Sequence, residues 1–116
     1  MNMINSLIIE GNATLKNYDE RLKICSLNLE VVRQYRNGKG EIAEENSSFE
    51  IYSYGQMADL VMNQFDKSAE HGIRVVGRLK MEKWKTDDKI CSKVVIVAEH
   101  IEFKPQPEKN LNLDGI

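Results

Sequence analysis

Apolar and polar residues alternate along most of the chain, and a period of two residues predicts β-strands. The clearest stretch runs from Ile73 to Trp84, where apolar residues from Ile73 to Met81 alternate with charged residues from Arg74 to Glu82. We expect this strand to turn one face to a core and the other face outward, with Trp84 on the charged side. Similar apolar patterns predict further strands at residues 5–12, 22–33, 49–54 and 90–103.

Turn-forming residues predict where the strands end. Residues 36–40 are rich in glycine and predict a hairpin connection, residues 85–89 predict a turn, and Pro105 and Pro107 predict the end of the sheet.

One segment has a helical period instead. Between the third and fourth strands, after Gly55, apolar residues recur at the spacing of one face of a short helix. This stripe, which we expect to close the core of a barrel, consists of Met57, Leu60, Val61 and Phe65.

The expected order is three strands, one helix and two strands. This is the order of the OB-fold, so we predict an all-β chain that forms a five-stranded OB-fold barrel with one short helix between strands 3 and 4. In the first strand, Gly11 permits a bend or a bulge. The domain should span residues 1–104, followed by a short C-terminal tail at residues 105–116. Such barrels bind oligonucleotides, sugars or proteins, so the fold alone leaves the function open.

Composition limits the class of protein. With 116 residues and 13.3 kDa, the chain has the size of one domain. Apolar residues make up 41% and charged residues 29%, which argues against a disordered chain, and no apolar run approaches the roughly 20 residues of a membrane helix. The N-terminus lacks the features of a secretory signal. Cys25 and Cys91 are too few for a disulfide scaffold, so we expect a cytoplasmic protein with reduced thiols.

Charge is unevenly distributed along the chain. Sixteen basic residues against eighteen acidic ones give a net charge of −2, which by itself disfavours a nucleic-acid binder. Between Arg74 and Lys93, however, there are seven basic and three acidic residues, whereas residues 41–50 contain four acidic and no basic residues. A cationic face can therefore form although the net charge is near zero. The simpler interpretation is that these side chains only cover solvent-exposed faces.

Patterns for catalysis or metal binding do not occur in the sequence. His71 and His100 have no neighbouring residues at metal-ligand spacing, and there is no nucleophile elbow, phosphate-binding loop or paired-carboxylate motif. We therefore expect a binding protein that performs no catalysis and needs neither a cofactor nor a metal.

Four short motifs follow one another between Asn5 and Phe103. They are Asn5-x-x-x-Ile9-x-Gly11-Asn12; Leu27-x-Leu29 followed by Tyr35-Arg36; Phe49-x-Ile51-x-x-Tyr54-Gly55-x-x-Ala58; and His71-Gly72-x-x-Val75-x-Gly77-Arg78-Leu79 ending in Lys83-Trp84. In these motifs the chain resembles the bacterial single-stranded DNA-binding protein family. The resemblance implies a cytoplasmic, nucleoid-associated protein that coats single-stranded DNA in replication, recombination and repair. It also implies a homotetramer of OB domains, with a dimer as the alternative.

The resemblance also assigns roles to individual residues. Family members place base-stacking aromatic residues at the positions of Tyr35, Tyr54 and Trp84, and phosphate-contacting cations at the positions of Lys80 and Lys83. The position of Phe49 lies near the contact between subunits in the family. We therefore expect Phe49 to pack in an oligomer interface.

The chain departs from the family in three places. Ser48 stands where a further stacking aromatic residue would lie, and Glu82 stands where a cation is common. The long linker and acidic tip of the family are missing, and residues 111–116 carry one side-chain carboxylate, Asp114. Replication and repair proteins remain candidate partners, but the resemblance does not extend to their recruitment through that tip.

Coating of a single strand requires aromatic platforms for the bases and a cationic track for the phosphates. Trp84 could instead cover apolar neighbours at the barrel rim, and Tyr54 could close the core. The lysines beside Trp84 favour binding, as does the glycine-rich loop after Tyr35. The predicted nucleic-acid-binding residues are Arg33, Tyr35, Arg36, Tyr54, Arg78, Lys80, Lys83, Trp84 and Lys85.

Two alternatives to strand coating remain at this point. One is a small, tailless OB-fold accessory protein of the primosome type, acting mainly through protein partners. The other is an OB module that binds only proteins or sugars, which the aromatic and basic residues around Trp84 and Tyr35 disfavour. The missing tail keeps the accessory protein under consideration.

Overall fold

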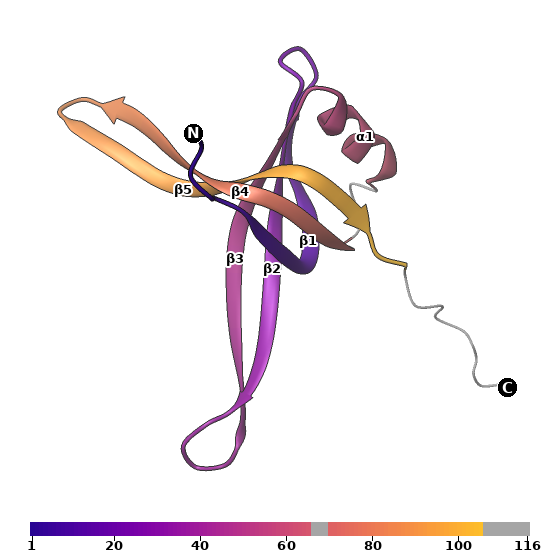
Figure 1. The fold of residues 1–116 in the computed structure, drawn as a ribbon, viewed down its shortest axis with the longest axis vertical. Helices are drawn as coiled ribbons and strands as arrows, with labels where there is room; N and C mark the ends of the chain where they lie inside the picture. The colour runs from indigo at the N-terminus through magenta and orange to yellow at the C-terminus, as the bar shows by residue number, and fades with distance from the viewer. Residues whose placement is uncertain (66–69, 106–116) are drawn as a thin grey trace, which may run out of the picture.

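Five strands close into a barrel in the computed structural model, which describes residues 1–65 and 70–105 (Figure 1). The strand order around the barrel is β1-β2-β3-β5-β4, and one helix lies between β3 and β4. The predicted all-β OB-fold is therefore confirmed. The predicted tail, apart from Pro105, lies outside the described residues. The elements are β1 (Leu7–Asp19), β2 (Ile24–Arg36), β3 (Ile42–Tyr54), α1 (Gln56–Gln64), β4 (His71–Thr86) and β5 (Lys89–Phe103).

The barrel closes through one short parallel contact. All other neighbouring strands pair antiparallel, whereas β3 and β5 pair parallel through Ile51 with Ile96 and Tyr52 with Val97. Alternation along the strands turns every second side chain inward, where apolar burial stabilises the fold. The largest fully buried apolar side chains of this core are Leu27, Leu29, Ile51, Ile73 and Val75.

Two glycines allow neighbouring strands to approach closely. A β-carbon on Gly77 would lie 2.2 Å from the backbone oxygen of Val97, and a β-carbon on Gly11 would lie 2.3 Å from that of Glu30. Only glycine fits such contacts without movement of the backbone. The pairing of β4 with β5 shifts next to Gly77, and the bulge in β1 lies at Lys16 rather than at Gly11.

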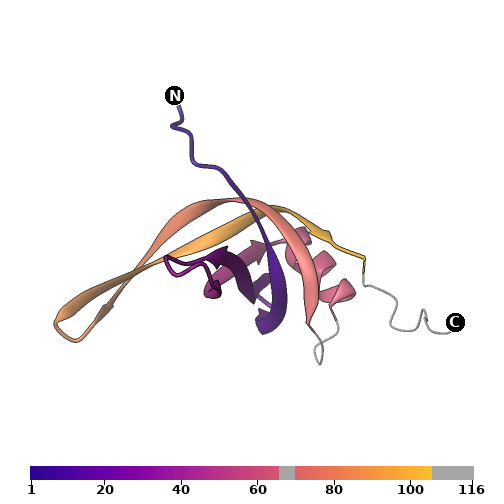
Figure 2. The ribbon, with the colours of Figure 1, turned by 90° about the horizontal axis from the view of Figure 1, so that it is seen from below.

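Two hairpins extend beyond the barrel as arms. We call residues 32–46 of β2 and β3 the β2–β3 arm, and residues 79–94 of β4 and β5 the β4–β5 arm. The β4–β5 arm projects from the side of the barrel that faces away from α1 (Figure 1, Figure 2). Leu79 and Met81 were expected to face the core, but they are exposed because the strand leaves the barrel after Gly77. That expectation was wrong for these two residues.

Helix α1 closes one end of the barrel. Ala58, Val61 and Phe65 are buried, as the apolar stripe predicts in part, but Leu60 is 59% exposed and does not belong to the core. The helix is tied to the β1–β2 turn by Asp59, which accepts hydrogen bonds from the Tyr18 hydroxyl at 2.7 Å and from a lysine ammonium of the turn at 2.9 Å. The hydrogen bond to Asp59 raises the pKa of Tyr18 to about 12.

Candidate nucleic-acid interface

The outward side of strands β3, β4 and β5 carries aromatic and charged side chains together. Alternation turns Ile51 and Ile96 into the core and Tyr52 and Val97 to the opposite side of the sheet, where Tyr52 is partly exposed and Val97 is buried. The pairing of Val97 with Arg78 places the charged side of β4 on the same surface. We call this surface the outer face. Its members named below are Glu50, Tyr52, Tyr54, Arg78, Lys80, Glu82, Trp84 and Lys93.

Tyr54 and Lys80 meet at the root of the β4–β5 arm. The Lys80 ammonium nitrogen lies 6.0 Å from the centre of the Tyr54 ring, within cation–π range. The Tyr54 ring is exposed and contacts Tyr52 edge to face, with 6.3 Å between ring centres. The structure thus joins two residues that the sequence assigned to one binding site, and Tyr54 does not close the core.

Glu82 neutralises part of this surface. Its carboxylate pairs with the Lys80 ammonium at 3.1 Å and raises the pKa of Lys80 by a hydrogen bond. Arg78 similarly pairs with Glu99 at 3.6 Å. Both cations are exposed; the Glu99 carboxylate beside Arg78 is exposed as well, and the Glu82 carboxylate beside Lys80 is partly exposed. Ion pairs of this kind contribute little to stability, so the cations remain accessible to another anion.

Trp84 lies further along the β4–β5 arm and also has a cation over its ring. The Lys93 ammonium is 5.9 Å from the ring centre, and 44% of the Trp84 surface is exposed. Trp84 is therefore not a covered rim residue. Lys93 was missed as a site residue. The observed register places it opposite Glu82, two residue pairs from Trp84.

Lys83 and Lys85 lie on the opposite side of the β4–β5 arm from Trp84. They alternate with Trp84 along β4 and pair with Ser92 and Ile90 of β5. Both side chains are exposed, and within residues 1–65 and 70–105 neither forms a hydrogen bond or an ion pair. The predicted cations of this arm are thus divided between its two faces, with Lys80 on the side of Trp84 and Lys83 and Lys85 on the other.

Arg33, Tyr35 and Arg36 are exposed on the β2–β3 arm, which points away from the β4–β5 arm (Figure 1). They line a shallow, open pocket together with Glu45. The Arg36 guanidinium donates a hydrogen bond to the backbone oxygen of Gly40 at 2.8 Å. These three predicted residues lie together, but the structure does not bring them to Tyr54 and Trp84.

Glu50 lies at the centre of an ion-pair cluster on the outer face. Its carboxylate accepts hydrogen bonds from Lys16 and Lys93, both at 2.8 Å, and from the Tyr52 hydroxyl at 3.2 Å. Partial burial by itself would raise the pKa of Glu50, but the bonds from the two lysines outweigh it and lower the pKa to about 2. No local sequence pattern predicts this cluster, since its members come from three strands.

Phe49 lines an apolar groove on the other side of the sheet. The groove has a volume of about 320 Å³ and passes between β1 and the root of the β4–β5 arm. Ile8, Leu79 and Val94 expose large apolar surfaces along it. The neighbouring Ser48 is exposed and carries no ring, so the outer face lacks a third aromatic platform at that position. The groove is lined by apolar residues and by one charged residue of the outer face, Glu50; the apolar ones are Leu7, Ile8, Ile9, Phe49, Leu79, Val94 and Ile96.

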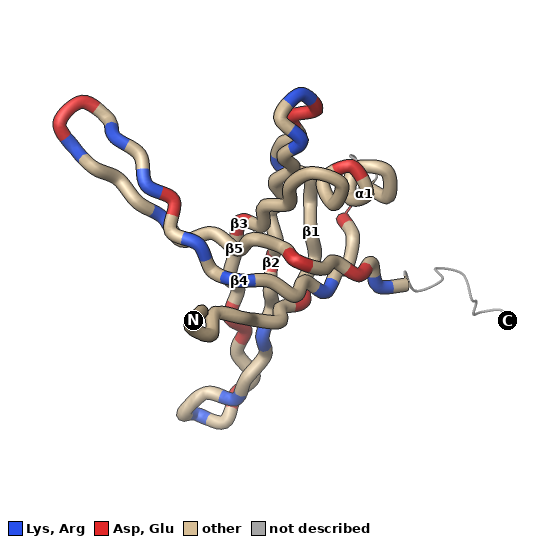
Figure 3. Tube along the Cα trace, turned by 45° about the horizontal axis from the view of Figure 1, so that its top comes forward, with Lys and Arg blue, Asp and Glu red and all other residues tan. Residues whose placement is uncertain are grey.

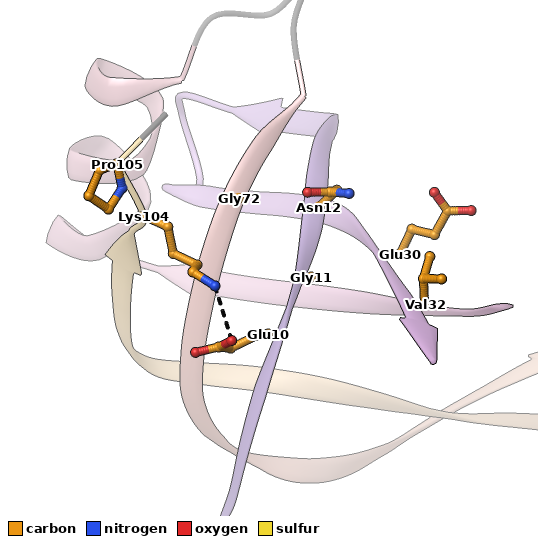
Figure 4. Close-up of a pocket in the computed structure, with 8 residues that line it drawn as sticks. All are labelled: Glu10, Gly11, Asn12, Glu30, Val32, Gly72, Lys104 and Pro105. Atoms are coloured by element: carbon orange, nitrogen blue, oxygen red, sulfur yellow. Dashed lines mark hydrogen bonds and ion pairs between the residues drawn. The ribbon is translucent and has the colours of Figure 1, made fainter. Parts of the chain in front are cut away.

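A second cleft is polar, and two of its charged residues, Glu10 and Lys104, form an ion pair. It has a volume of about 430 Å³ and lies beside β1, with Asn12, Glu30 and Lys104 among its lining residues (Figure 4). Lys104 and Arg74 bind the two carboxylate oxygens of Glu10 at 3.2 and 2.6 Å. Aromatic residues are absent from the lining, so the cleft offers no surface on which a base could stack.

Many of the charged residues lie on the two arms. Basic segments are spread along the β4–β5 arm and its root, and acidic residues occupy its tip (Figure 3).

Among the residues that the structure describes, no group of three or more His, Cys, Asp or Glu side chains could hold a metal ion. No helix in the same residues is long and apolar enough to cross a membrane.

Comparison with known proteins gives a consistent result. Residues 4–104 match the model of the Single-strand binding protein family. The chain is 32% identical over 110 residues to a single-stranded DNA-binding protein of Aquifex aeolicus (strain VF5), a match that covers 91% of this chain and 74% of that protein.

Solved structures show the same fold at lower identity. The chain is similar to the Plasmodium falciparum SSB complex with ssDNA, with a TM-score of 0.72 and 17% identity over 90% of this chain and 98% of the other. It is also similar to a deletion mutant of the single-stranded DNA binding protein from Thermus aquaticus, with a TM-score of 0.73 and 24% identity over 88% of this chain and 51% of the other.

Proposed function

Because the chain belongs to the single-strand binding protein family, we propose that it binds single-stranded DNA without regard to base sequence and protects it in replication, recombination and repair. The observation that carries the proposal is the pairing of an exposed aromatic ring with a cation at two places on the outer face. Stacking is open to any base because every base has a π-face, and phosphates supply sequence-independent attraction. The accessory-protein alternative is not favoured by the family match.

The strand should run over the outer face from the barrel onto the β4–β5 arm. Bases would stack on Tyr54 and Trp84, while Arg78 and Lys80 contact phosphates. Lys83 and Lys85 would add attraction at the edges of the arm. The residues Arg33, Tyr35 and Arg36 would bind a more distant part of a longer strand, because they lie on the other arm.

We propose a homotetramer, or a dimer as the smaller alternative, built on the apolar groove. Soluble monomers rarely expose contiguous apolar patches of this kind, so the groove calls for a partner. A second copy of the chain is the proposed occupant, because the groove contains Phe49, and the outer face lies on the other side of the sheet. Self-association there would cover Phe49, Ile8 and Leu79 and leave the aromatic platforms free.

The remaining expectations belong to the same proposal. The binding domain is residues 1–104 and the tail is residues 105–116. The protein acts by binding and not by catalysis, in the cytoplasm and near the nucleoid. Replication and repair proteins are candidate partners.

The function can be tested with a titration that uses Trp84 as the probe. The chain contains one tryptophan, so its fluorescence reports on this platform alone. Adding dT oligomers of increasing length should quench the fluorescence, while native mass spectrometry gives the stoichiometry of each complex. Duplex DNA serves as the control and should quench weakly. Unchanged fluorescence at saturating oligomer would remove Trp84 from the binding surface, and a protein that binds no oligomer would contradict the proposal.

A further inference from the structure

A β-bulge brings a lysine of β1 into contact with the outer face. The pairing of β1 with β2 shifts between Leu15 and Asn17, so Lys16 is the extra residue of a bulge. Its ammonium reaches over β2 to Glu50 on β3, which itself pairs with Asn28 of β2. The bulge therefore aims Lys16 at a site that its sequence position does not indicate.

Glu50 holds two lysines at one place. Lys16 binds one carboxylate oxygen and Lys93 the other, each at 2.8 Å. The Glu50 side chain is only 16% exposed, whereas those of Lys16 and Lys93 are 54% and 43% exposed. The carboxylate thus lies beneath two accessible ammonium groups, and the three side chains together carry one net positive charge.

Both ammonium groups keep donors for a further anion. Each lysine ammonium has three N–H donors, and one of them goes to Glu50. Lys93 also lies 5.9 Å from the centre of the Trp84 ring. A nucleotide stacked on Trp84 would therefore bring its phosphate backbone next to Lys93. Lys16 lies beside Lys93, because both bind the Glu50 carboxylate.

We propose that Lys16 and Lys93 form a phosphate-binding pair for the single strand, and that Glu50 is the positioning residue that holds the two ammonium groups together. Without the carboxylate, two neighbouring positive charges would repel each other. The proposal rests on the proposed function, since its ligand is the phosphate backbone of the strand bound to the outer face.

The salt dependence of binding tests the pair. A labelled dT oligomer, followed by fluorescence anisotropy at several NaCl concentrations, gives the slope of log affinity against log salt. Lys16→Gln and Lys93→Gln should each lower the slope by roughly 0.7, the value of one lost phosphate contact on a single strand, and the double variant by about twice that amount. Lys93→Arg keeps the charge and should keep the slope.

A matched control separates phosphate binding from loss of an ion pair. Lys23 is also half exposed and paired with a carboxylate, Asp59 of α1, at 2.9 Å, but its side chain contacts neither Glu50 nor Trp84. Lys23→Gln should leave the slope unchanged. If Lys16→Gln and Lys93→Gln also leave it unchanged while the wild type binds, the pair is only structural and this proposal is wrong. A wild type that does not bind the oligomer would overturn the proposed function itself.

The role of Glu50 has its own readout. Glu50→Gln removes the charge that holds the two lysines together, so Lys16→Gln and Lys93→Gln should each change the salt slope less in a Glu50→Gln background than in the wild-type background. Equal changes in the two backgrounds would show that Glu50 does not position the pair, whatever its effect on the melting temperature.

Discussion

At the scale of single residues, the Glu50 carboxylate makes the fold sensitive to acid. Its pKa is about 2 in the folded protein, below the ordinary value of 4.5. A lowered pKa in the folded state means that the charged form stabilises the fold, fully above about pH 4.5 and progressively less as the pH falls towards 2. The melting temperature of the wild type should therefore exceed that of Glu50→Gln near neutral pH, and the difference should shrink below pH 4.5. A difference that is constant from pH 7 to pH 2.5 would contradict this.

Gly77 should tolerate no β-carbon. A methyl group there would meet the backbone of Val97 at 2.2 Å, and backbone atoms cannot move aside as a flexible side chain can. Gly77→Ala should destabilise the protein by about 1–3 kcal/mol, the usual cost of overpacking, measured by urea unfolding. Gly38→Ala is the matched control, because nothing lies within 4 Å of its added β-carbon. Equal stability of the two variants would contradict the close approach of β4 and β5.

How well the position and contacts of a residue can be predicted from the sequence depends on how many strands the contact involves. The outward position of Trp84 follows from alternation within one strand and could be predicted. The contact of Lys93 with Trp84 depends on the register of two strands, which the turn between them sets. The contact of Lys16 with Glu50 depends on a bulge and on a strand lying between the two residues, and no local pattern encodes it.

At the scale of elements, the strands are longer than their apolar patterns. The strand expected at residues 49–54 begins at Ile42, although Glu44, Glu45 and Asn46 have low strand propensity. In the β2–β3 arm, the backbone of these residues pairs continuously with β2. Backbone pairing of this kind does not depend on a buried apolar face, so a search for alternating apolar residues does not find it. The same holds for Leu79 and Met81, which keep the alternation of a core strand on an arm that has no core.

The two faces of the β4–β5 arm should differ in binding. Trp84→Ala should weaken binding of a labelled dT oligomer by about 1–3 kcal/mol per stacked base, measured by anisotropy, because the base loses its platform. Ile90→Ala removes an exposed apolar side chain from the opposite face of the same arm and is the matched control. Both variants should keep the wild-type melting temperature, since neither residue packs in the barrel core. Equal losses of affinity would mean that the strand does not favour the outer face.

At the scale of the whole molecule, the aromatic and charged outer face and the apolar groove are different surfaces that meet at Glu50. The net charge is −2, yet the outer face carries lysines next to exposed aromatic rings. The net charge of a chain therefore does not predict the charge of one face. The apolar groove lies on the other side of the sheet and contains the residue that the family resemblance assigns to a subunit contact. In the proposed function, one side of the sheet binds single-stranded DNA and the other binds a second copy of the chain.

Assembly should depend on this groove. Ile8 is 71% exposed and is not part of the buried core, so Ile8→Asp should leave the barrel folded, as circular dichroism can check, while placing a charge in the proposed interface. Phe49→Ser removes an aromatic ring from the same groove. Sedimentation at micromolar concentration should show a tetramer or a dimer for the wild type and a shift towards the monomer for both variants. Leu60→Asp is the control: it charges an apolar side chain of α1 that is similarly exposed, outside the groove, and should not change the mass. A wild type that is monomeric at micromolar concentration would contradict the proposed assembly, and variants that keep the wild-type mass would place the interface elsewhere on the molecule.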